Sequence, residues 1–327
     1  MPDPHNAHTK TLGWVGVGRM GAALVERLIR AGCDVSVYNR TRSKTEPLEA
    51  LGARVVDTPA DLSDRDIVIS MVSSSDDLLS VMAGEDGVLS HAGRTPGLLV
   101  DCSTVSVEGA QEVRRRAEAA GSQMLAAPVS GNPKVARAGR LSIVASGPSI
   151  GFDLALPYLE ILGRSVTYVG EGEVARLVKI CHNLMLGIVA AALSEITVLA
   201  ERGGVSRSDL LSFINDSVMG SVFTRYKTPA FVELDFTPTF TGHLLSKDLS
   251  LGLDAAERLG VPLPVTTTVQ SLLQDLIEEG FGDRDFASLI LLEARASGMT
   301  LEPELVEVDD GLSPLDELAR QASRGER

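Results

Sequence analysis

Residues 13–21 read GWVGVGRMG and place three glycines in the spacing GxGxxG. The apolar run Leu12–Val17 leads into this turn with the pattern of a strand. Met20–Ala31 then repeats apolar residues at helical spacing, and Asp34–Tyr38 alternates like a second strand. A strand, a glycine-rich turn, a helix and a second strand in this order predict a dinucleotide-binding unit.

Each glycine of this turn has a separate physical task in such a unit. Gly16 allows the tight turn, Gly18 lets the backbone approach a pyrophosphate, and Gly21 allows the helix to pack on the strand. The free N–H groups and positive dipole end of the helix then point at the phosphates. An ordinary turn containing three glycines is the alternative, and the flanking strand and helix argue against it.

The residues after the second strand indicate which dinucleotide is bound. A site for NAD usually has Asp or Glu here, which accepts hydrogen bonds from the ribose hydroxyls. This chain reads NRTRSK at residues 39–44, with three cations and no carboxylate. A 2′-phosphate would find charge-assisted hydrogen bonds there, so we expect NADP(H). NAD(H) stays possible because Asn39 can bind a free ribose hydroxyl, and a solvated basic turn is the structural alternative.

Length and charge limit the class of protein. A chain of 327 residues predicts about two domains with ample core, and 44% hydrophobic with 23% charged residues is ordinary for a globular protein. The net charge of −14 argues against the broad phosphate-neutralising surface of a nucleic-acid binder. The basic turn at residues 39–44 therefore stands out as a focused anion site.

Cysteines, histidines and apolar stretches narrow the class further. The three cysteines are scattered without a disulfide framework or zinc spacing, which favours a cytoplasmic protein. The five histidines show no metal-ligand pattern, so we expect no metal, and the first ten residues lack the apolar core of a secretory signal. The longest apolar stretch, Leu184–Leu193, is too short to cross a bilayer and predicts a buried helix with no membrane partner.

Alternating strand and helix patterns continue to about residue 169 and then stop. Runs such as Ile67–Val72, Leu98–Asp101 and Leu141–Ser146 predict parallel strands, whereas Glu173–Arg202 predicts one long helix with further helices after it. The expected fold is α/β, a doubly wound Rossmann sheet followed by an all-helical domain joined by the long interdomain helix. Residues 1–10 would form a flexible N-terminus, 11–169 the nucleotide-binding domain, 170–299 the helical substrate and dimerisation domain, and 300–327 a peripheral or disordered tail.

Two loops after predicted strands carry polar groups suited to a ligand. The segment DCST at residues 101–104 ends one strand, where hydroxyls can serve a ribose, a nicotinamide or a carboxylate; a helix cap is the alternative. The segment SGN at residues 130–132 follows another strand. Gly131 lets the backbone approach a ligand and Ser130 can receive a carboxylate, with a plain loop as the alternative.

Lys179 and Asn183 lie four residues apart on the predicted long helix and so share one face. A lysine beside an asparagine could protonate and orient one substrate oxygen. A surface lysine is the alternative, but apolar residues on both sides of Lys179 predict partial burial. Burial lowers the pKa of a lysine toward the range useful for acid–base catalysis.

Together these motifs resemble the β-hydroxyacid dehydrogenase family, which includes 3-hydroxyisobutyrate dehydrogenase, tartronate semialdehyde reductase and the glyoxylate/succinic semialdehyde reductases. The resemblance covers about residues 11–295. The matching stretches, in family order, are GWVGVGRMG at 13–21, DCSTV at 101–105, APVSGN at 127–132, KICHN at 179–183 and SKDLSLGL at 246–253.

The resemblance implies hydride transfer between a nicotinamide and a small β-hydroxy acid or aldehyde acid, in a homodimer or homotetramer. Lys179 would be the catalytic general acid/base, with Asn183 polarising the substrate oxygen. The implied substrate-binding residues are Ser103, Ser130, Gly131 and Asn132. The implied cofactor-binding residues are Gly16, Val17, Gly18, Arg19, Met20, Gly21, Asn39, Arg40, Thr41, Val72, Ser73, Thr104 and Lys247.

Four positions depart from the family pattern. Ala126 stands where Asp is common, Ser73 where proline is usual, Asn132 in place of a second glycine, and His182 in place of an asparagine. The last two line the implied substrate pocket, so they bear on the identity of the substrate rather than on the reaction. The role of His182 stays open.

Two other functions share parts of this pattern. An NADPH-dependent imine reductase has a similar two-domain plan but usually lacks a lysine at the position of Lys179. A non-catalytic NADP(H)-binding protein would tend to lose the catalytic lysine. Retention of Lys179, Asn183 and Ser130 together favours the dehydrogenase.

Overall fold

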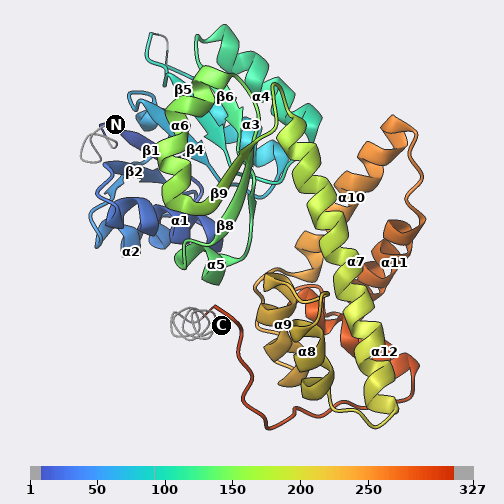
Figure 1. Cartoon of the computed structure of the whole chain (residues 1–327). Coiled ribbons are helices and arrows are strands. Elements are labelled where there is room, and N and C mark those ends of the chain that lie inside the picture. Colours follow the sequence, from blue (N-terminus) through green and yellow to red (C-terminus); the bar gives the residue numbers. More distant parts are fainter. Residues whose placement is uncertain (1–8, 92, 313–327) are drawn as a thin grey trace, which may run out of the picture. The chain divides into compact units, whose positions relative to one another are not determined.

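The computed structural model describes residues 9–91 and 93–312. By packing, the chain divides into two compact units, Met1–Cys181 and His182–Arg327. Helix α7 (Val174–Arg202) crosses this division, so its first turns belong to the first unit (Figure 1). Most of the predicted N-terminal segment and of the predicted tail, residues 1–8 and 313–327, lie outside the described residues.

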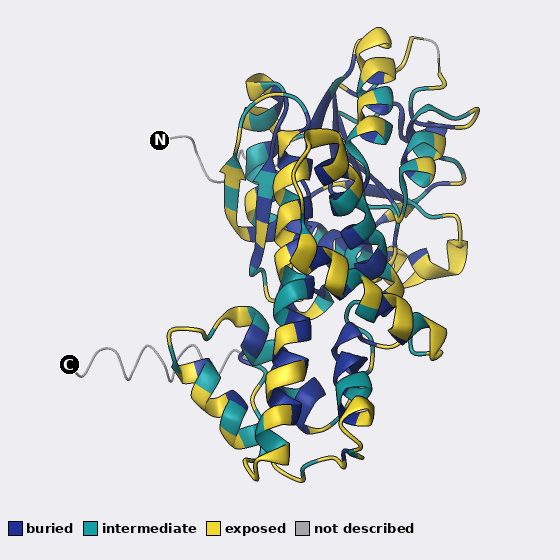
Figure 2. Ribbon diagram, turned by 90° about the vertical axis from the view of Figure 1, so that its right-hand side faces the viewer, coloured by how far each residue is buried: buried dark blue, intermediate teal, exposed yellow. Residues whose placement is uncertain are grey.

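A six-stranded parallel sheet forms the centre of the first unit, in the order β3-β2-β1-β4-β5-β6. Its strands are β1 (Leu12–Val15), β2 (Val35–Tyr38), β3 (Arg54–Val55), β4 (Ile67–Ser70), β5 (Leu98–Asp101) and β6 (Gln123–Ala126). All but the edge strand β3 are largely buried apolar runs, as a parallel sheet covered on both faces requires (Figure 2). Successive strands are added to one side of β1 as far as β3, and then to its other side from β4 to β6. The boundary between β1 and β4 is the point where doubly wound folds bind ligands. The predicted Rossmann sheet is confirmed.

Helices cover both faces of this sheet (Figure 1). Helices α3 and α4 enclose one core against it, in which Leu78 and Val113 pack with Val68 and Leu99. Helices α1 and α6 pack together on the other face. The helices of this unit that precede α7 are α1 (Arg19–Arg30), α2 (Glu46–Glu49), α3 (Ser75–Ala83), α4 (Val107–Ala119), α5 (Pro133–Arg137) and α6 (Ser149–Leu162).

Three strands form a second, smaller sheet rather than extending the first. They are β7 (Val129–Ser130), β8 (Leu141–Ala145) and β9 (Gly163–Tyr168), in the order β7-β8-β9. The two strands β7 and β8 pair antiparallel, and an antiparallel bridge between Ala126 and Ser146 links this sheet to the end of β6. The strand predicted at Leu141–Ser146 therefore exists as β8, but it belongs to the second sheet, because the chain turns back through α5 after β7.

The second unit contains helices and, among its described residues, no strand. Its helices are the rest of α7, α8 (Arg207–Asp216), α9 (Val222–Val232), α10 (Gly242–Leu259), α11 (Pro264–Glu278) and α12 (Leu289–Ala296). The predicted all-helical architecture is confirmed. The described part of the segment after residue 299 runs along this unit (Figure 1), where the Glu304 carboxylate accepts hydrogen bonds from the backbone N–H groups of Arg207 and Ser208.

Among the helices of the described residues, α7 alone is long and apolar enough to cross a membrane, by length and composition only. The sequence prediction considered only the ten residues Leu184–Leu193, which are too short for this. Half of the most apolar 18-residue window of α7 is buried inside the protein. The core helix of a soluble protein meets the same criteria, so this helix is weak evidence for a membrane span.

Candidate active site

The glycine-rich turn has the steric constraints predicted for it. Gly16 has a φ of +96°, and a Cβ added there would lie 2.2 Å from the carbonyl oxygen of Met71. A Cβ on Gly21 would lie 2.0 Å from the carbonyl oxygen of Gly16. A Cβ on Gly18 would meet no described atom within 4 Å. The turn and packing roles of Gly16 and Gly21 are confirmed, and the space at Gly18 admits a close ligand.

Helix α1 begins directly after this turn, at the carboxyl end of β1. Gly18 is its N-cap, and this glycine has no side chain to cap the helix. The N-terminus of a helix carries N–H groups without intrahelical partners and a positive dipole end, which together suit a phosphate. The turn therefore fits the pyrophosphate of a dinucleotide.

Asn39 braces the turn from the end of β2. Its Oδ1 accepts a hydrogen bond of 2.8 Å from the N–H of Val17, and its Nδ2 donates one of 2.8 Å to the carbonyl of Thr41. Both polar atoms of the amide are thus engaged inside the protein. The expectation that Asn39 would bind a ribose hydroxyl stays a prediction, and these contacts reduce what it can offer.

Arg40 is an accessible cation of this turn, as are the exposed Arg42 and Lys44. The side chain of Arg40 is 87% exposed and lies 3.4 Å from the carboxylate of Asp77, whereas Arg42 pairs with Asp57. A pair this exposed is weak and is easily replaced by a phosphate. Thr41 is exposed beside it.

Ser103 lies buried at the carboxyl end of β5. Its hydroxyl donates to Asp101 at 2.7 Å and accepts from the N–H of Val72 at 2.8 Å. The hydroxyl proton is thus committed inside the protein, which leaves Ser103 only acceptor capacity toward a substrate. Next to it, burial raises the pKa of the Cys102 thiol well above its usual range, so this cysteine is inert.

The other residues predicted on these loops are more accessible. Val72 and Thr104 are half-buried, and Ser73 is exposed. The Ser103–Val72 hydrogen bond ties the loop after β4 to the loop after β5. The structure therefore brings these predicted cofactor residues to one edge of the sheet, at its carboxyl end.

Residues 131–132 form the turn between β7 and α5. Gly131 has a φ of +133°, and a Cβ there would lie 2.5 Å from Cδ2 of Leu141, so a side chain is excluded. The buried Asn132 caps α5, with its Oδ1 accepting from the N–H of Val135 at 2.9 Å. Its Nδ2 is buried and makes no hydrogen bond to a described residue. Half-buried Ser130 precedes this turn.

Lys179 lies in the second turn of α7, within the first unit, and is half-buried. One turn earlier, the fully buried Arg176 donates to Asp101 at the carboxyl end of β5, at 2.7 Å. Partial burial of Lys179 was predicted from its apolar neighbours; of these Ile180 is buried, whereas Leu177 and Val178 are exposed. The other buried residues of the helix start are Ala175 and Arg176.

In the second unit, Asp248 joins two of the predicted residues. Its carboxylate accepts a hydrogen bond from the amide Nδ2 of Asn183 at 2.5 Å and lies 2.9 Å from the ammonium group of Lys247. Asp248 is 1% exposed and Asn183 2%. The Oδ1 of Asn183 also lies 3.0 Å from Nδ1 of His182. The structure therefore places Asn183 and Lys247 on one buried carboxylate.

Sequence reasoning missed Asp248 and Arg176. Asp248 stands inside the quoted stretch SKDLSLGL, where a Lys-Asp pair at a helix start looks like an ordinary surface pair. Arg176 pairs with a residue 75 positions away, so local spacing gives no signal for it. Among the described residues no group of three or more His, Cys, Asp or Glu could hold a metal ion.

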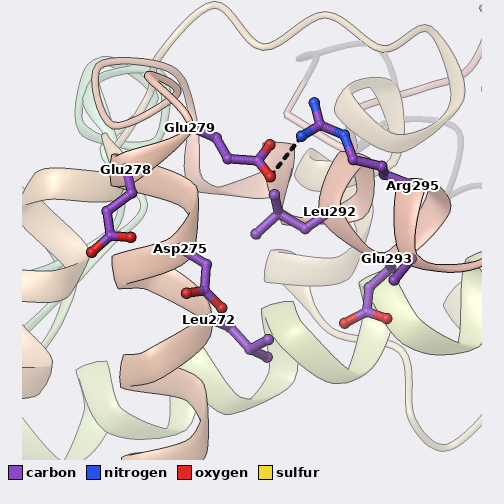
Figure 3. Close-up of a pocket in the computed structure, with 8 residues that line it drawn as sticks. Leu272, Asp275, Glu278, Glu279, Leu292, Glu293 and Arg295 are labelled. Carbon is purple, nitrogen blue, oxygen red and sulfur yellow. Dashed lines mark ion pairs between the residues drawn. The ribbon is translucent and has the colours of Figure 1, made fainter.

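A pocket of 390 Å³ beside α11 and α12 lies elsewhere in the helical unit and contains none of the predicted site residues (Figure 3). Four carboxylates line it, and its one cation, Arg295, pairs with Glu279 at 2.6 Å. A surface this acidic repels the phosphates of a dinucleotide and the carboxylate of a hydroxy acid. The lining residues are Leu272, Asp275, Glu278, Glu279, Leu292, Glu293, Arg295 and Ala296.

Comparison with protein families identifies both parts of the chain. Residues 11–170 match the NAD binding domain of 6-phosphogluconate dehydrogenase. Residues 170–292 match the NAD-binding domain of NADP-dependent 3-hydroxyisobutyrate dehydrogenase. The chain belongs to the β-hydroxyacid dehydrogenase family. It is an NAD(P)-dependent oxidoreductase.

The chain aligns with individual relatives over nearly their whole length. The chain is 35% identical to the uncharacterised oxidoreductase YfjR of Bacillus subtilis, over 84% of this chain and 97% of that one. It is 31% identical to 3-hydroxyisobutyrate dehydrogenase of Pseudomonas aeruginosa, over 85% and 96%. The crystal structure of 3-hydroxyisobutyrate dehydrogenase from Salmonella typhimurium has a TM-score of 0.79 at 27% identity, covering 86% of this chain and 99% of that one.

Imine reductases are more distant. The enzyme from Myxococcus stipitatus has a TM-score of 0.57 at 24% identity, covering 85% of this chain and 98% of that one, which indicates a shared fold alone. The dehydrogenase interpretation is therefore favoured over the imine reductase one.

Proposed function

We propose that this enzyme transfers a hydride between NADP(H), or less readily NAD(H), and the carbinol or carbonyl carbon of a small β-hydroxy acid or its semialdehyde. The observation that carries the proposal is the start of α7. There Lys179 stands one turn after an arginine bound to the carboxyl end of β5, and this is the edge of the sheet where such folds bind their ligands. The names of the relatives supply the substrate class.

The glycine turn and the N-terminus of α1 would hold the pyrophosphate, and Arg40 with Thr41 would hold the adenosine ribose and its phosphate. The nicotinamide supplies the hydride when bound. In the reductive direction, Lys179 would donate a proton to the substrate's carbonyl oxygen as the substrate's carbonyl carbon accepts the hydride. Asn183, one turn further along α7, would polarise that oxygen, and the Ser130–Asn132 turn would hold the substrate carboxylate.

The test is the Lys179→Ala variant, assayed by NADPH absorbance with a panel of small aldehyde acids. Loss of the proton donor should lower kcat by about 10²–10⁴-fold, with NADPH affinity unchanged. Lys10→Ala is the matched control, since Lys10 precedes β1 at the opposite edge of the same sheet. Unaltered turnover in Lys179→Ala would remove the proposed acid/base.

A second variant tests the preference for NADP(H). Arg40→Ala should weaken NADPH binding at least about tenfold, since a charge-assisted hydrogen bond is lost, and leave NADH binding nearly unchanged. Equal losses for both cofactors would contradict a 2′-phosphate contact.

We also propose a homodimer or homotetramer in the cytoplasm. Family resemblance supports the assembly, and the three cysteines, all free in the structure, suit a reducing compartment. Light scattering on the purified protein tests the assembly, and a monomer at assay concentration would refute it.

A further inference from the structure

We propose that Arg176 and Asp101 are positioning residues, which fix the first turns of α7 and thereby place Lys179 for proton transfer. The inference rests on the proposed role of Lys179. Neither residue was assigned a role from the sequence, although Asp101 stands in the quoted segment DCST, and both lie in the same compact unit as Lys179.

The guanidinium of Arg176 is bound from two directions. Its Nη1 donates to Asp101 Oδ2 at 2.7 Å and its Nε donates to Glu173 at 2.5 Å. The side chains of all three residues are at least 96% buried. A planar guanidinium held at two edges fixes orientation as well as distance, which a lysine cannot do.

The contacts continue from both carboxylates into the sheet. Asp101 Oδ1 accepts from the hydroxyls of Ser70 and Ser103, at 2.7 Å each, so it gathers the ends of β4 and β5. Glu173 also binds the guanidinium of Arg114 at 2.6 Å, which in turn donates to the carbonyl of Met124 in β6. The helix start is thus tied to three neighbouring strands.

The two arginines and two carboxylates balance in charge, but the network is a costly way to stabilise a fold. Burying ions carries a desolvation penalty that well-packed apolar side chains avoid. Arg176 Nη2 is also buried without a hydrogen bond to any described residue. What the network offers beyond stability is a defined orientation of α7.

That orientation is transmitted directly to Lys179. Residues three apart on a helix are neighbours on its surface, with Cβ atoms about 5–6 Å apart. If Arg176 loses its partners, the helix start can rotate or fray and carry Lys179 with it. A displacement of about 1 Å at a catalytic group can lower a rate by about 10²-fold.

The experiment compares Arg176→Lys and Asp101→Asn with wild type, using kcat, KM, NADPH affinity and amide hydrogen exchange. These mild variants keep side-chain volume and should fold, which circular dichroism checks. We expect kcat to fall about 10–100-fold. We also expect KM and NADPH affinity to stay within a factor of about two, and exchange at residues 177–181 to rise at least about tenfold.

Arg207→Lys is the matched control, because Arg207 is equally buried in the second unit and binds none of the predicted site residues. It should leave kcat and exchange at residues 177–181 unchanged.

If both variants fold and keep wild-type kcat, the proposal is overturned, whether or not amide hydrogen exchange rises. A fall in kcat without faster amide exchange at residues 177–181 also overturns it. If wild type turns over no substrate of the panel, the proposed function fails. In that case, faster amide exchange at residues 177–181 of the two variants would still support the fixing of the start of α7, and unchanged exchange would refute it.

Discussion

Two fully buried arginines, one in each unit, have nearly the same chemistry and different surroundings. Arg176 binds the carboxylate of Asp101 at the carboxyl end of β5 and that of Glu173 just before α7, beside the predicted cofactor loops. Arg207 binds both oxygens of Glu201 at 2.7 Å and the carbonyls of Val232 and Glu302. Its partners come from the end of α7, the end of α9 and the C-terminal segment.

The difference teaches that burial and charge alone do not mark a functional residue. Arg207 joins segments that are distant in sequence, so its effect is on stability. Arg176 joins a helix start to the edge of the sheet where ligands bind, so its effect extends to whatever that helix carries. The three predictions below separate these roles.

Arg207→Met has the largest expected effect. It leaves the half-buried carboxylate of Glu201 and two carbonyls without their cation, which should lower the free energy of unfolding by about 2–3 kcal/mol. Urea unfolding followed by circular dichroism measures the loss. The fraction that stays folded should keep wild-type kcat, and a lower kcat per folded molecule would break the contrast with Arg176.

Unlike Arg207→Met, Ser103→Ala should lower activity as well as stability. It removes one hydrogen bond to Asp101 and one from Val72, which should lower the free energy of unfolding by about 1–2 kcal/mol. Because it frees the loops after β4 and β5, NADPH affinity and kcat should also fall several-fold. Unfolding curves, fluorescence titration with NADPH and initial rates measure the three effects.

The matched control for Ser103→Ala is Ser194→Ala. Ser194 is equally buried, and its hydroxyl donates to the Ala190 carbonyl within α7. It should change stability slightly and activity not at all. Equal effects of the two variants on kcat would show that buried serines at the sheet edge have no special role.

Local patterns predicted most of the first unit. The glycine turn, the strands around it and the long helix follow from apolar spacing, and the sterics of Gly16 and Gly21 match their predicted tasks. The edge strand β3 was missed because two residues carry no periodicity. The helices after α7 were predicted only as a group, and α9 carries Pro229 inside it, which weakens its helical pattern.

Contacts between distant residues could not be predicted. The pairs Arg176–Asp101 and Asn183–Asp248 span 75 and 65 positions, and no local sequence pattern connects the two members of either pair. Asn39 was assigned to a ligand because its amide is versatile, and the structure uses that amide to brace the turn. Ser103 was assigned to substrate by the family resemblance, and in the structure its hydroxyl donates to Asp101. Polar side chains near a site serve either the ligand or the loops that shape it, and only their partners distinguish the two.

Asp66→Asn has the smallest expected effect and concerns the opposite edge of the sheet. The backbone N–H of Thr11, aided by the Thr11 hydroxyl and Lys10, lowers the pKa of Asp66, against a partial opposing effect of burial. A carboxyl whose pKa is lower in the folded state stabilises the protein above its unfolded pKa, and that stability is lost as the pH falls through the folded value.

Asp66→Asn should therefore lower the free energy of unfolding by less than about 1 kcal/mol at pH 7, since the side chain is well exposed. The difference should shrink as the pH falls below the ordinary pKa of an aspartate, about 3.9, and vanish once the pH lies below the lowered pKa of folded Asp66. Thermal unfolding of both proteins at pH 7 and at a series of falling pH values measures this, with kcat at pH 7 unchanged. A difference that stayed constant over the whole series would mean that Asp66 acts through hydrogen bonding rather than charge, because a neutral carboxyl and an amide have nearly the same shape.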